Sequence, residues 1–161
     1  MPMQLVGLGE YFKDMPSKRQ FRTIGRTITE TDIINFVNCT DLTEVFFINQ
    51  EAIEKESAFG RRFAPGALCY CFSEALIAQA TLQYTGLAML HLELDIKAPV
   101  FVGDTIYAES EVLAKRPSRG RPGQGIVTVR TRGIKADGIP FMVLERAILM
   151  PMKETTRSSA Q

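Results

Sequence analysis

The chain has 161 residues, with 19 basic and 18 acidic side chains, so its net charge is only +1. This length predicts one domain with a substantial core, and the near-neutral charge argues against a nucleic acid or a membrane surface as the partner. The sequence contains no run of about 18 apolar residues, the length that a helix needs to span a bilayer. Residues 1–18 also lack the apolar core of a signal peptide. We therefore expect a cytoplasmic protein.

The three cysteines are Cys39, Cys69 and Cys71. Because their number is odd and two of them have a C-x-C spacing, they predict neither a disulfide framework nor a usual zinc site. Cys69 and Cys71 lie in an apolar helical stretch, where cysteine behaves as a small hydrophobe. We therefore expect no metal.

The first third of the chain predicts short elements. Residues 1–20 are predicted as an N-terminal arm and 21–28 as a short strand. Thr29, followed three residues later by Asp32, resembles a capping box and predicts a helix from about Glu30 to Asn38. The following segments are predicted as a loop, Cys39 to Ile48, and a short helix, Gln50 to Glu56.

A long apolar segment forms the centre of the chain. Pro65 and Gly66 precede the run from Ala67 to Leu82, and proline suits the first turn of a helix because its missing N–H would have no partner there. The run is apolar nearly all round, so this helix must be buried on most sides. Gly86 stands where a C-terminal cap is expected.

After Gly86 the apolar period changes from 3.6 to 2. In 89–96 (MLHLELDI), alternate residues are apolar, which predicts a strand with one buried face formed by Leu90, Leu92, Leu94 and Ile96. Turn signals at Gly103-Asp104 and Asp137-Gly138 separate further strands. These strands are predicted at 105–114, 125–135 and 139–150, with a basic loop at 115–124 and a disordered tail at 153–161.

A buried helix followed by antiparallel strands predicts the α+β class. A curved antiparallel sheet wrapped around a long central helix is the hotdog fold, which we expect here as a single domain over 21–152. Such a sheet leaves an edge strand free to pair with a second copy, so a homodimer is expected.

Three motifs in this order resemble the MaoC-like dehydratase and (R)-specific enoyl-CoA hydratase family over roughly residues 20–150. They are F-G-R-R-F-A-P-G-A-L (59–68), A-P-V-F-V-G-D-T-I (98–106) and R-P-G-Q-G-I-V-T-V (121–129). The resemblance implies an acyl-CoA or acyl-ACP thioester as the ligand. It implies no cofactor beyond the coenzyme A of the substrate, and enoyl-CoA/3-hydroxyacyl-CoA interconversion as the activity.

The loop that carries the family's catalytic aspartate and histidine departs from the pattern. Active relatives have G-D-x-N-P-[IL]-H-x-D, in which the two groups activate water. In the gapless register Leu42 takes the place of the Asp and Phe47 that of the His, whereas a shift of one residue brings in Asp41 and Phe46. Neither register supplies a histidine. The implied hydratase is therefore atypical, and a non-catalytic acyl-thioester-binding protein or a hotdog thioesterase is the alternative.

The resemblance places the thioester carbonyl on the backbone amide of Gly66, as in an oxyanion hole. The alternative is that Pro65-Gly66 only starts the helix tightly. Phe47 and Pro65 would line the substrate. Glu44, among apolar neighbours, could act as an acid or base, as could Asp41; both could equally be solvated loop residues.

Other charged residues have weaker claims to a role. Glu74 stands alone in the apolar helix, where some hotdog thioesterases and the ACP dehydratases carry a catalytic acid, but we expect it to make a structural hydrogen bond or to face solvent. His91, the sole histidine, is expected to be structural or solvated; facing a dimer partner's cleft is the alternative. Two roles stay open for the basic residues Lys115, Arg116, Arg119 and Arg121: they could form a solvated loop, or they could contact the phosphates of coenzyme A. Arg61 and Arg62 are weaker candidates for the phosphate contact.

Overall fold

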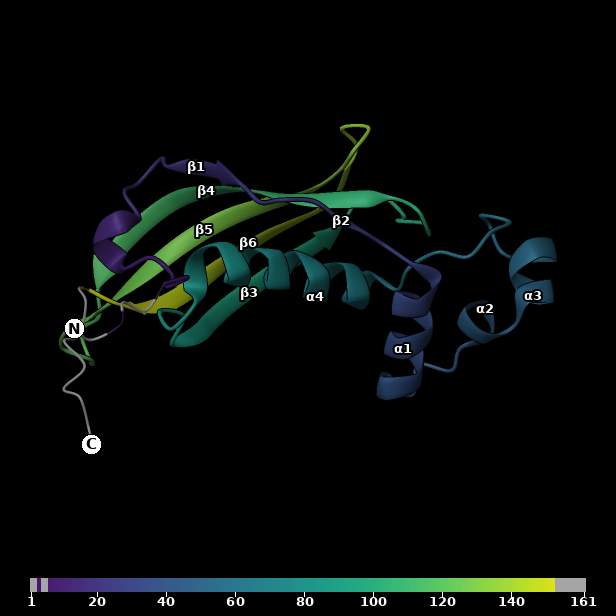
Figure 1. Ribbon diagram of the computed structural model, residues 1–161, viewed down its shortest axis with the longest axis horizontal. Helices are drawn as coiled ribbons and strands as arrows, with labels where there is room; N and C mark the ends of the chain where they lie inside the picture. The colour runs from purple at the N-terminus through teal and green to yellow at the C-terminus, as the bar shows by residue number, and fades with distance from the viewer. Residues whose placement is uncertain (1–2, 4–5, 153–161) are drawn as a thin grey trace.

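The computed structural model describes residues 3 and 6–152, and its elements are shown in Figure 1. In chain order they are η1 (Phe12–Asp14), β1 (Gln20–Arg22), β2 (Arg26–Thr27), α1 (Glu30–Thr40), α2 (Val45–Ile48), α3 (Gln50–Lys55), α4 (Gly66–Ile77), the π-helix η2 (Ala78–Leu82), β3 (Ala88–Ile96), β4 (Thr105–Pro117), β5 (Gln124–Lys135) and β6 (Pro140–Pro151). All strand pairs are antiparallel, in the order β1-β4-β5-β6-β3, with β2 also on β4. The predicted α+β hotdog arrangement is confirmed.

The sheet curves over α4, which lies along its inner side (Figure 1). The helix buries Leu68, Cys69 and Leu76 in a core cluster that includes Ile106 of β4 and Leu144 of β6. Its opposite face stays accessible, because Ala67 and Cys71 are exposed. Within the described chain, no helix has the length and apolarity that a bilayer crossing requires.

The α1 helix begins as the sequence predicts. Thr29 Oγ1 accepts from the Asp32 amide at 3.1 Å, and Asp32 Oδ2 accepts from the Thr29 amide at 2.8 Å, which completes a capping box. Three other boundaries differ from the predictions. The predicted strand 21–28 forms two short strands, the predicted loop 39–48 contains α2, and the predicted basic loop begins only after Pro117, where β4 ends.

The break between β1 and β2 has a local cause at Gly25. A Cβ atom at this position would lie 2.6 Å from the Tyr107 ring, so only glycine lets the chain pass this close to β4. The central helix also changes character near its end. It is α-helical to Ile77 and continues to Leu82 as a π-helix, which sequence periodicity alone does not distinguish.

The prediction of a buried face on β3 is only half right. Ile96 lies beside Gly66 of α4, and Leu92 pairs with inward-facing Arg146, so both face the helix as expected. A register shift between Met89 and His91 then interrupts the alternation, and Met89 contacts Tyr70 of α4. However, Leu92 is 36% exposed and Ile96 is 52% exposed. The reason is that β3 pairs only with β6 and forms the edge of the described sheet.

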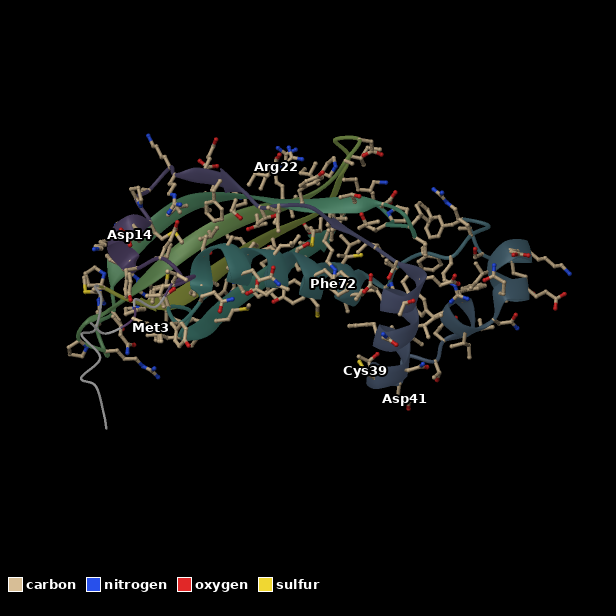
Figure 2. The ribbon with its side chains drawn as sticks, in the orientation of Figure 1. Met3, Asp14, Arg22, Cys39, Asp41 and Phe72 are labelled. Carbon is tan, nitrogen blue, oxygen red and sulfur yellow. The ribbon has the colours of Figure 1, made fainter. Side chains whose placement is uncertain are left out.

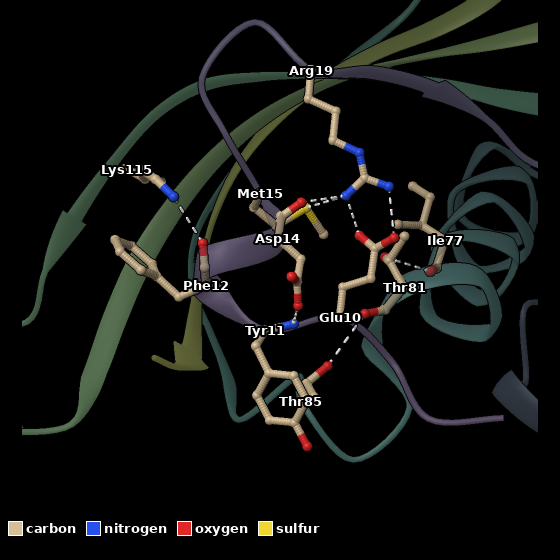
Figure 3. A network of polar contacts seen from close by, with 10 residues as sticks. All are labelled: Glu10, Tyr11, Phe12, Asp14, Met15, Arg19, Ile77, Thr81, Thr85 and Lys115. Carbon is tan, nitrogen blue, oxygen red and sulfur yellow. Dashed lines mark hydrogen bonds and ion pairs between the residues drawn. The ribbon is translucent and has the colours of Figure 1, made fainter. Parts of the chain in front are cut away.

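The N-terminal arm is attached to the far end of the central helix (Figure 3). The amide of Glu10 donates to Thr81 O at 2.8 Å, and the Glu10 carboxylate accepts from both terminal nitrogens of Arg19, with Nη2 at 2.6 Å. Phe12 packs in a second core cluster, where its ring would clash with any Cβ on Gly125. The arm is therefore packed onto the domain, and the predicted tail 153–161 falls outside the described residues.

Candidate functional site

The α4 helix begins without a capping side chain. Its N-cap residue is Pro65, which offers no side-chain acceptor, whereas Thr29, Glu44 and Asn49 cap α1, α2 and α3. The first amides of a helix have no partner within the helix and lie at the positive end of its dipole. The start of α4 can therefore donate to an oxygen atom that the chain itself does not supply.

Gly66, the first residue of α4, is not required by packing. A Cβ atom there would meet only the Ile96 side chain, at an ordinary contact distance of 3.5 Å. Its φ is also not in the left-handed region that favours glycine. What glycine provides here is open space beside the first amides of α4, which suits close approach by a ligand.

The V-F-V-G-D-T motif fixes the position of this helix start. Gly103 has a φ of +92°, which favours glycine, and the Asp104 carboxylate closes the turn by accepting from the Phe101 amide at 3.0 Å. The segment before α4 is attached to this turn, because the Ala64 amide donates to Val100 O at 2.8 Å. The motif therefore has a structural role: its turn holds the segment that leads into α4 and so positions Gly66.

Phe47, which takes the place of the family's histidine in the gapless register, belongs to an aromatic cluster formed by Phe47, Phe59, Phe63 and Phe101. The Phe47 and Phe63 ring centroids are 5.3 Å apart, and Phe63 is three residues before Gly66. Arg62 holds the same segment by donating from Nη1 to Phe47 O at 2.9 Å. The cluster places α2 beside the start of α4, with a phenyl ring where the resemblance expects an imidazole.

Glu44 and Asp41 both have local structural roles that the sequence analysis missed. The Glu44 carboxylate caps α2 by accepting from the Phe46 amide at 2.9 Å. Asp41 ends α1 in the left-handed conformation, with a φ of 55°. Both are exposed, and Figure 2 shows Asp41 at the end of α1 that lies away from the sheet. A cap at Glu44 could have been recognised from its position just before an apolar run.

The predicted phosphate-binding arginines lie far from Gly66 within one chain. Arg116, Arg119 and Arg121 are exposed around the β4–β5 hairpin. Gly66 is instead beside the start of β4, and the 13 residues of β4 separate the two ends by about 40 Å. Arg61 is much nearer, stacked on Phe101 with its guanidinium carbon 3.6 Å from the ring centroid.

His91 is exposed, whereas Glu74 is paired with a basic side chain. His91 is exposed on β3, and because Ile96 faces α4, the alternation of the strand turns His91 away from the helix. Glu74 forms an ion pair with Arg146 of β6. Of the two helical cysteines, burial raises the pKa of Cys69 to about 12, whereas Cys71 is exposed, contrary to expectation. No group of three potential metal ligands occurs among the residues that the structure describes.

Two hollows lie elsewhere on the described surface. One lies on the outer face of the sheet, around Arg22 and Glu109 of β1 and β4, which form an ion pair with 3.6 Å between Arg22 Nη1 and Glu109 Oε1. The other lies between Ile24 and α4 and is partly filled by Arg26, which stacks on Phe72 at 3.7 Å. Neither includes Gly66, which is itself partly exposed in the single chain.

Known proteins of similar sequence are acyl-CoA hydratases and dehydratases. A β-methylmalyl-CoA dehydratase of Chloroflexus aurantiacus is 35% identical over 83 residues, which are 52% of this chain and 23% of that protein. An (R)-specific enoyl-CoA hydratase of Rhodospirillum rubrum is 29% identical over 109 residues, 68% of this chain and 74% of that protein. The chain thus spans about a quarter of the first relative and most of the second.

Solved structures share the fold. The MaoC-like dehydratase of Rhodospirillum rubrum has a TM-score of 0.79 at 22% identity, covering 91% of this chain and all of that one. A Mycobacterium tuberculosis protein with a double hotdog fold has a TM-score of 0.76 at 19% identity, covering 95% of this chain and 47% of that one. The profile of the FAS1-like dehydratase domain region matches residues 18–144. Because this match covers most of its length, the chain belongs to the FAS1-like dehydratase-region family, and the solved structures that it resembles include a MaoC-like dehydratase.

Proposed function

We propose that this protein binds an acyl-CoA thioester at the start of α4, in a site of the hydratase and dehydratase type. The observation that carries the proposal is the helix start at Pro65-Gly66, which has no capping side chain and where glycine leaves space that a side chain would fill. The thioester carbonyl accepts from the free amides there, and the positive end of the helix stabilises negative charge on its oxygen. Both curated relatives act on coenzyme A thioesters by name, which supports the same ligand class.

The proposed site lacks the usual means of moving a proton. Hydration needs a group that removes a proton from water and one that protonates the acyl carbon. The position expected for the histidine is taken by Phe47, and His91 faces away from α4. The chain on its own therefore holds the thioester and turns it over slowly or not at all.

Catalysis through Glu44 is the second candidate function. The aromatic contact between Phe47 and Phe63 brings the start of α2 toward the segment that leads into α4, and Glu44 stands at that start. Its carboxylate accepts only the exposed Phe46 amide in the described chain, so one oxygen is available for a water molecule. In this candidate mechanism Glu44 is the acid–base group of an atypical hydratase.

Calorimetric titration with crotonyl-CoA, run beside a hydration assay, separates the two functions. Micromolar binding without turnover supports the binding protein, whereas turnover that Glu44→Gln abolishes supports the second candidate. Glu51→Gln, an exposed glutamate in α3, is the matched control. Absence of any acyl-CoA binding in the folded protein would overturn the proposal.

We further propose that a second copy pairs along β3. The strand offers an unpaired edge and apolar side chains that are about half exposed, such as Leu90 at 51%. Pairing there would enclose the open surface beside α4 and remove an aggregation-prone edge. A Leu90→Glu substitution is expected to convert a dimer into a monomer in light scattering, and a monomeric unsubstituted protein would contradict this arrangement.

For the nucleotide end of the ligand we propose Arg61 as the phosphate contact within the same chain, in place of the hairpin arginines. Arg61 is exposed, five residues before Gly66, and fixed in orientation by Phe101. An arginine so oriented suits phosphate because its planar fork makes paired hydrogen bonds. An Arg61→Ala change should weaken acyl-CoA binding in a salt-dependent manner, whereas Arg119→Ala should not.

A further inference from the structure

A charged side chain lies buried beneath α4. Arg146 of β6 is only 1% exposed, and Glu74 of α4 is the one acceptor that its guanidinium meets among the described residues. Its Nε is buried and has no hydrogen-bond partner. A buried donor without an acceptor is costly, so this arrangement is unusual for a purely structural ion pair.

The residues around this ion pair continue the surface that starts at Gly66. Tyr70 and Glu74 follow Gly66 at intervals of four, so all three lie on one face of α4. This face looks over β3 (Figure 1): Gly66 is beside Ile96, and the Tyr70 hydroxyl donates to Met89 Sδ at 3.7 Å. We call this surface the α4–β3 face, formed by Gly66, Tyr70, Glu74, Met89, Leu92 and Ile96.

The α4–β3 face has apolar sides and a polar end. Ile96 is partly exposed beside Gly66, and Leu92, also partly exposed, pairs with Arg146 at the polar end formed by Tyr70, Glu74 and Arg146. The sulfur that accepts from the Tyr70 hydroxyl is a weak acceptor. Gly66 and Glu74 are about 12 Å apart along the helix axis. The polar end therefore lies within reach of a short acyl chain whose carbonyl is at Gly66.

The charges at the polar end decide which oxygen it can accept. Glu74 already neutralises Arg146, so a carboxylate placed there would meet a second negative charge at close range. A hydroxyl or oxo group adds no charge; it accepts from Arg146 or Tyr70, and a hydroxyl can also donate to Glu74. The pair thus fits an uncharged oxygen.

Resting on the proposed thioester site, we propose that Tyr70, Glu74 and Arg146 are specificity-determining residues. They select acyl thioesters whose short acyl chain carries an uncharged oxygen near its far end, such as a terminal hydroxyl, over plain hydrocarbon chains. Tyr70 and Arg146 supply the donors, and Glu74 excludes carboxylates.

Three acyl-CoAs of equal chain length test the proposal by calorimetry: butyryl-CoA, 4-hydroxybutyryl-CoA and succinyl-CoA. The unsubstituted protein is expected to bind 4-hydroxybutyryl-CoA about tenfold more tightly than butyryl-CoA. Succinyl-CoA should bind most weakly. Equal affinity for all three, or tightest binding of succinyl-CoA, overturns the selectivity while leaving the thioester site intact. Failure of all three to bind overturns the proposed function itself.

Two variants assign the selectivity to the buried pair. Glu74→Gln removes the negative charge, so succinyl-CoA should gain at least tenfold in affinity. The double change Glu74→Leu with Arg146→Met replaces the pair by apolar side chains of similar size, which proteins tolerate well, and it should bring butyryl-CoA level with or above 4-hydroxybutyryl-CoA.

The matched control is Arg130→Met with Glu145→Leu. This pair joins β5 and β6 at 3.1 Å on the outer face of the sheet, and it should leave the order of affinities unchanged. Unaltered selectivity in the folded Glu74/Arg146 double variant, or altered selectivity in the control, would overturn the assignment.

Discussion

Replacing Gly66 by alanine should separate binding from stability. A methyl group at this position points at Ile96 and touches it at 3.5 Å without a clash, and the backbone φ suits any residue. Alanine also loses less conformational freedom on folding, which stabilises a compatible site by about 0.4–1 kcal/mol. For a chain of this size, that corresponds to a rise in Tm of about 1–4 °C.

The same methyl group should weaken acyl-CoA binding. It occupies the space between the first amides of α4 and Ile96, where the proposed ligand enters. Loss of one hydrogen bond to the thioester carbonyl, worth about 1 kcal/mol, raises Kd about fivefold, and steric exclusion adds to this. Calorimetry with crotonyl-CoA and a thermal melt measure the two effects independently.

The control is Gly120→Ala in the β4–β5 hairpin, where an added Cβ atom meets nothing within 4 Å. It should leave crotonyl-CoA binding unchanged. Unaltered binding in a stabilised Gly66→Ala protein would refute the reasoning, because the open side of Gly66 would then serve no ligand. A destabilised variant would show that this glycine is needed for packing after all.

Three further predictions concern single features of the chain. Asp32→Ala should lower the free energy of unfolding at pH 7 by about 1 kcal/mol. Burial acts to raise the pKa of Asp32, but hydrogen bonds from Thr29 and Arg26 outweigh it, so this pKa is lowered. In denaturant titrations, the difference in stability from the unsubstituted protein should therefore vanish as the pH falls through the lowered pKa. In the folded protein, alkylation at pH 8 followed by mass spectrometry should spare Cys69, whose pKa is raised to about 12, and rapid labelling there would contradict its burial. The double change Leu42→Asp with Phe47→His should raise crotonyl-CoA hydration above that of the unsubstituted protein, and a folded, inactive variant would argue that more than these two groups is missing.

Local rules predicted the elements that local chemistry determines. The Thr29–Asp32 capping box, the Pro65-Gly66 helix start and the Asp137-Gly138 hairpin each depend on residues close together in the sequence. The prediction that α4 is buried on most sides was wrong for the described chain, because Ala67 and Cys71 on its outer face are exposed. The order of these elements was sufficient to predict the hotdog fold.

Long-range geometry could not be predicted in the same way. Whether Leu92 is buried depends on whether another strand lies beyond β3, which the alternation in 89–96 does not reveal. The partner of Glu74 is Arg146, 72 residues away in the sequence, and no local sequence pattern predicts that the two meet. The aromatic cluster likewise joins Phe47 to Phe101 through Phe63 and Phe59, across three separate segments.

At the proposed site, binding the thioester and moving its protons are separable tasks, and in the favoured proposal the chain retains the groups for only the first. The amides at the start of α4 depend on the backbone, so they survive any change of side chain in the preceding loop. The proton-transfer groups depend on two side chains, and in the gapless register Leu42 and Phe47 cannot replace them. Loss of general acid–base groups costs about 10²- to 10⁴-fold in rate but leaves carbonyl binding in place. A chain with an intact Gly66 and an aromatic ring in place of the imidazole should therefore retain affinity for acyl-CoA long after it has lost turnover.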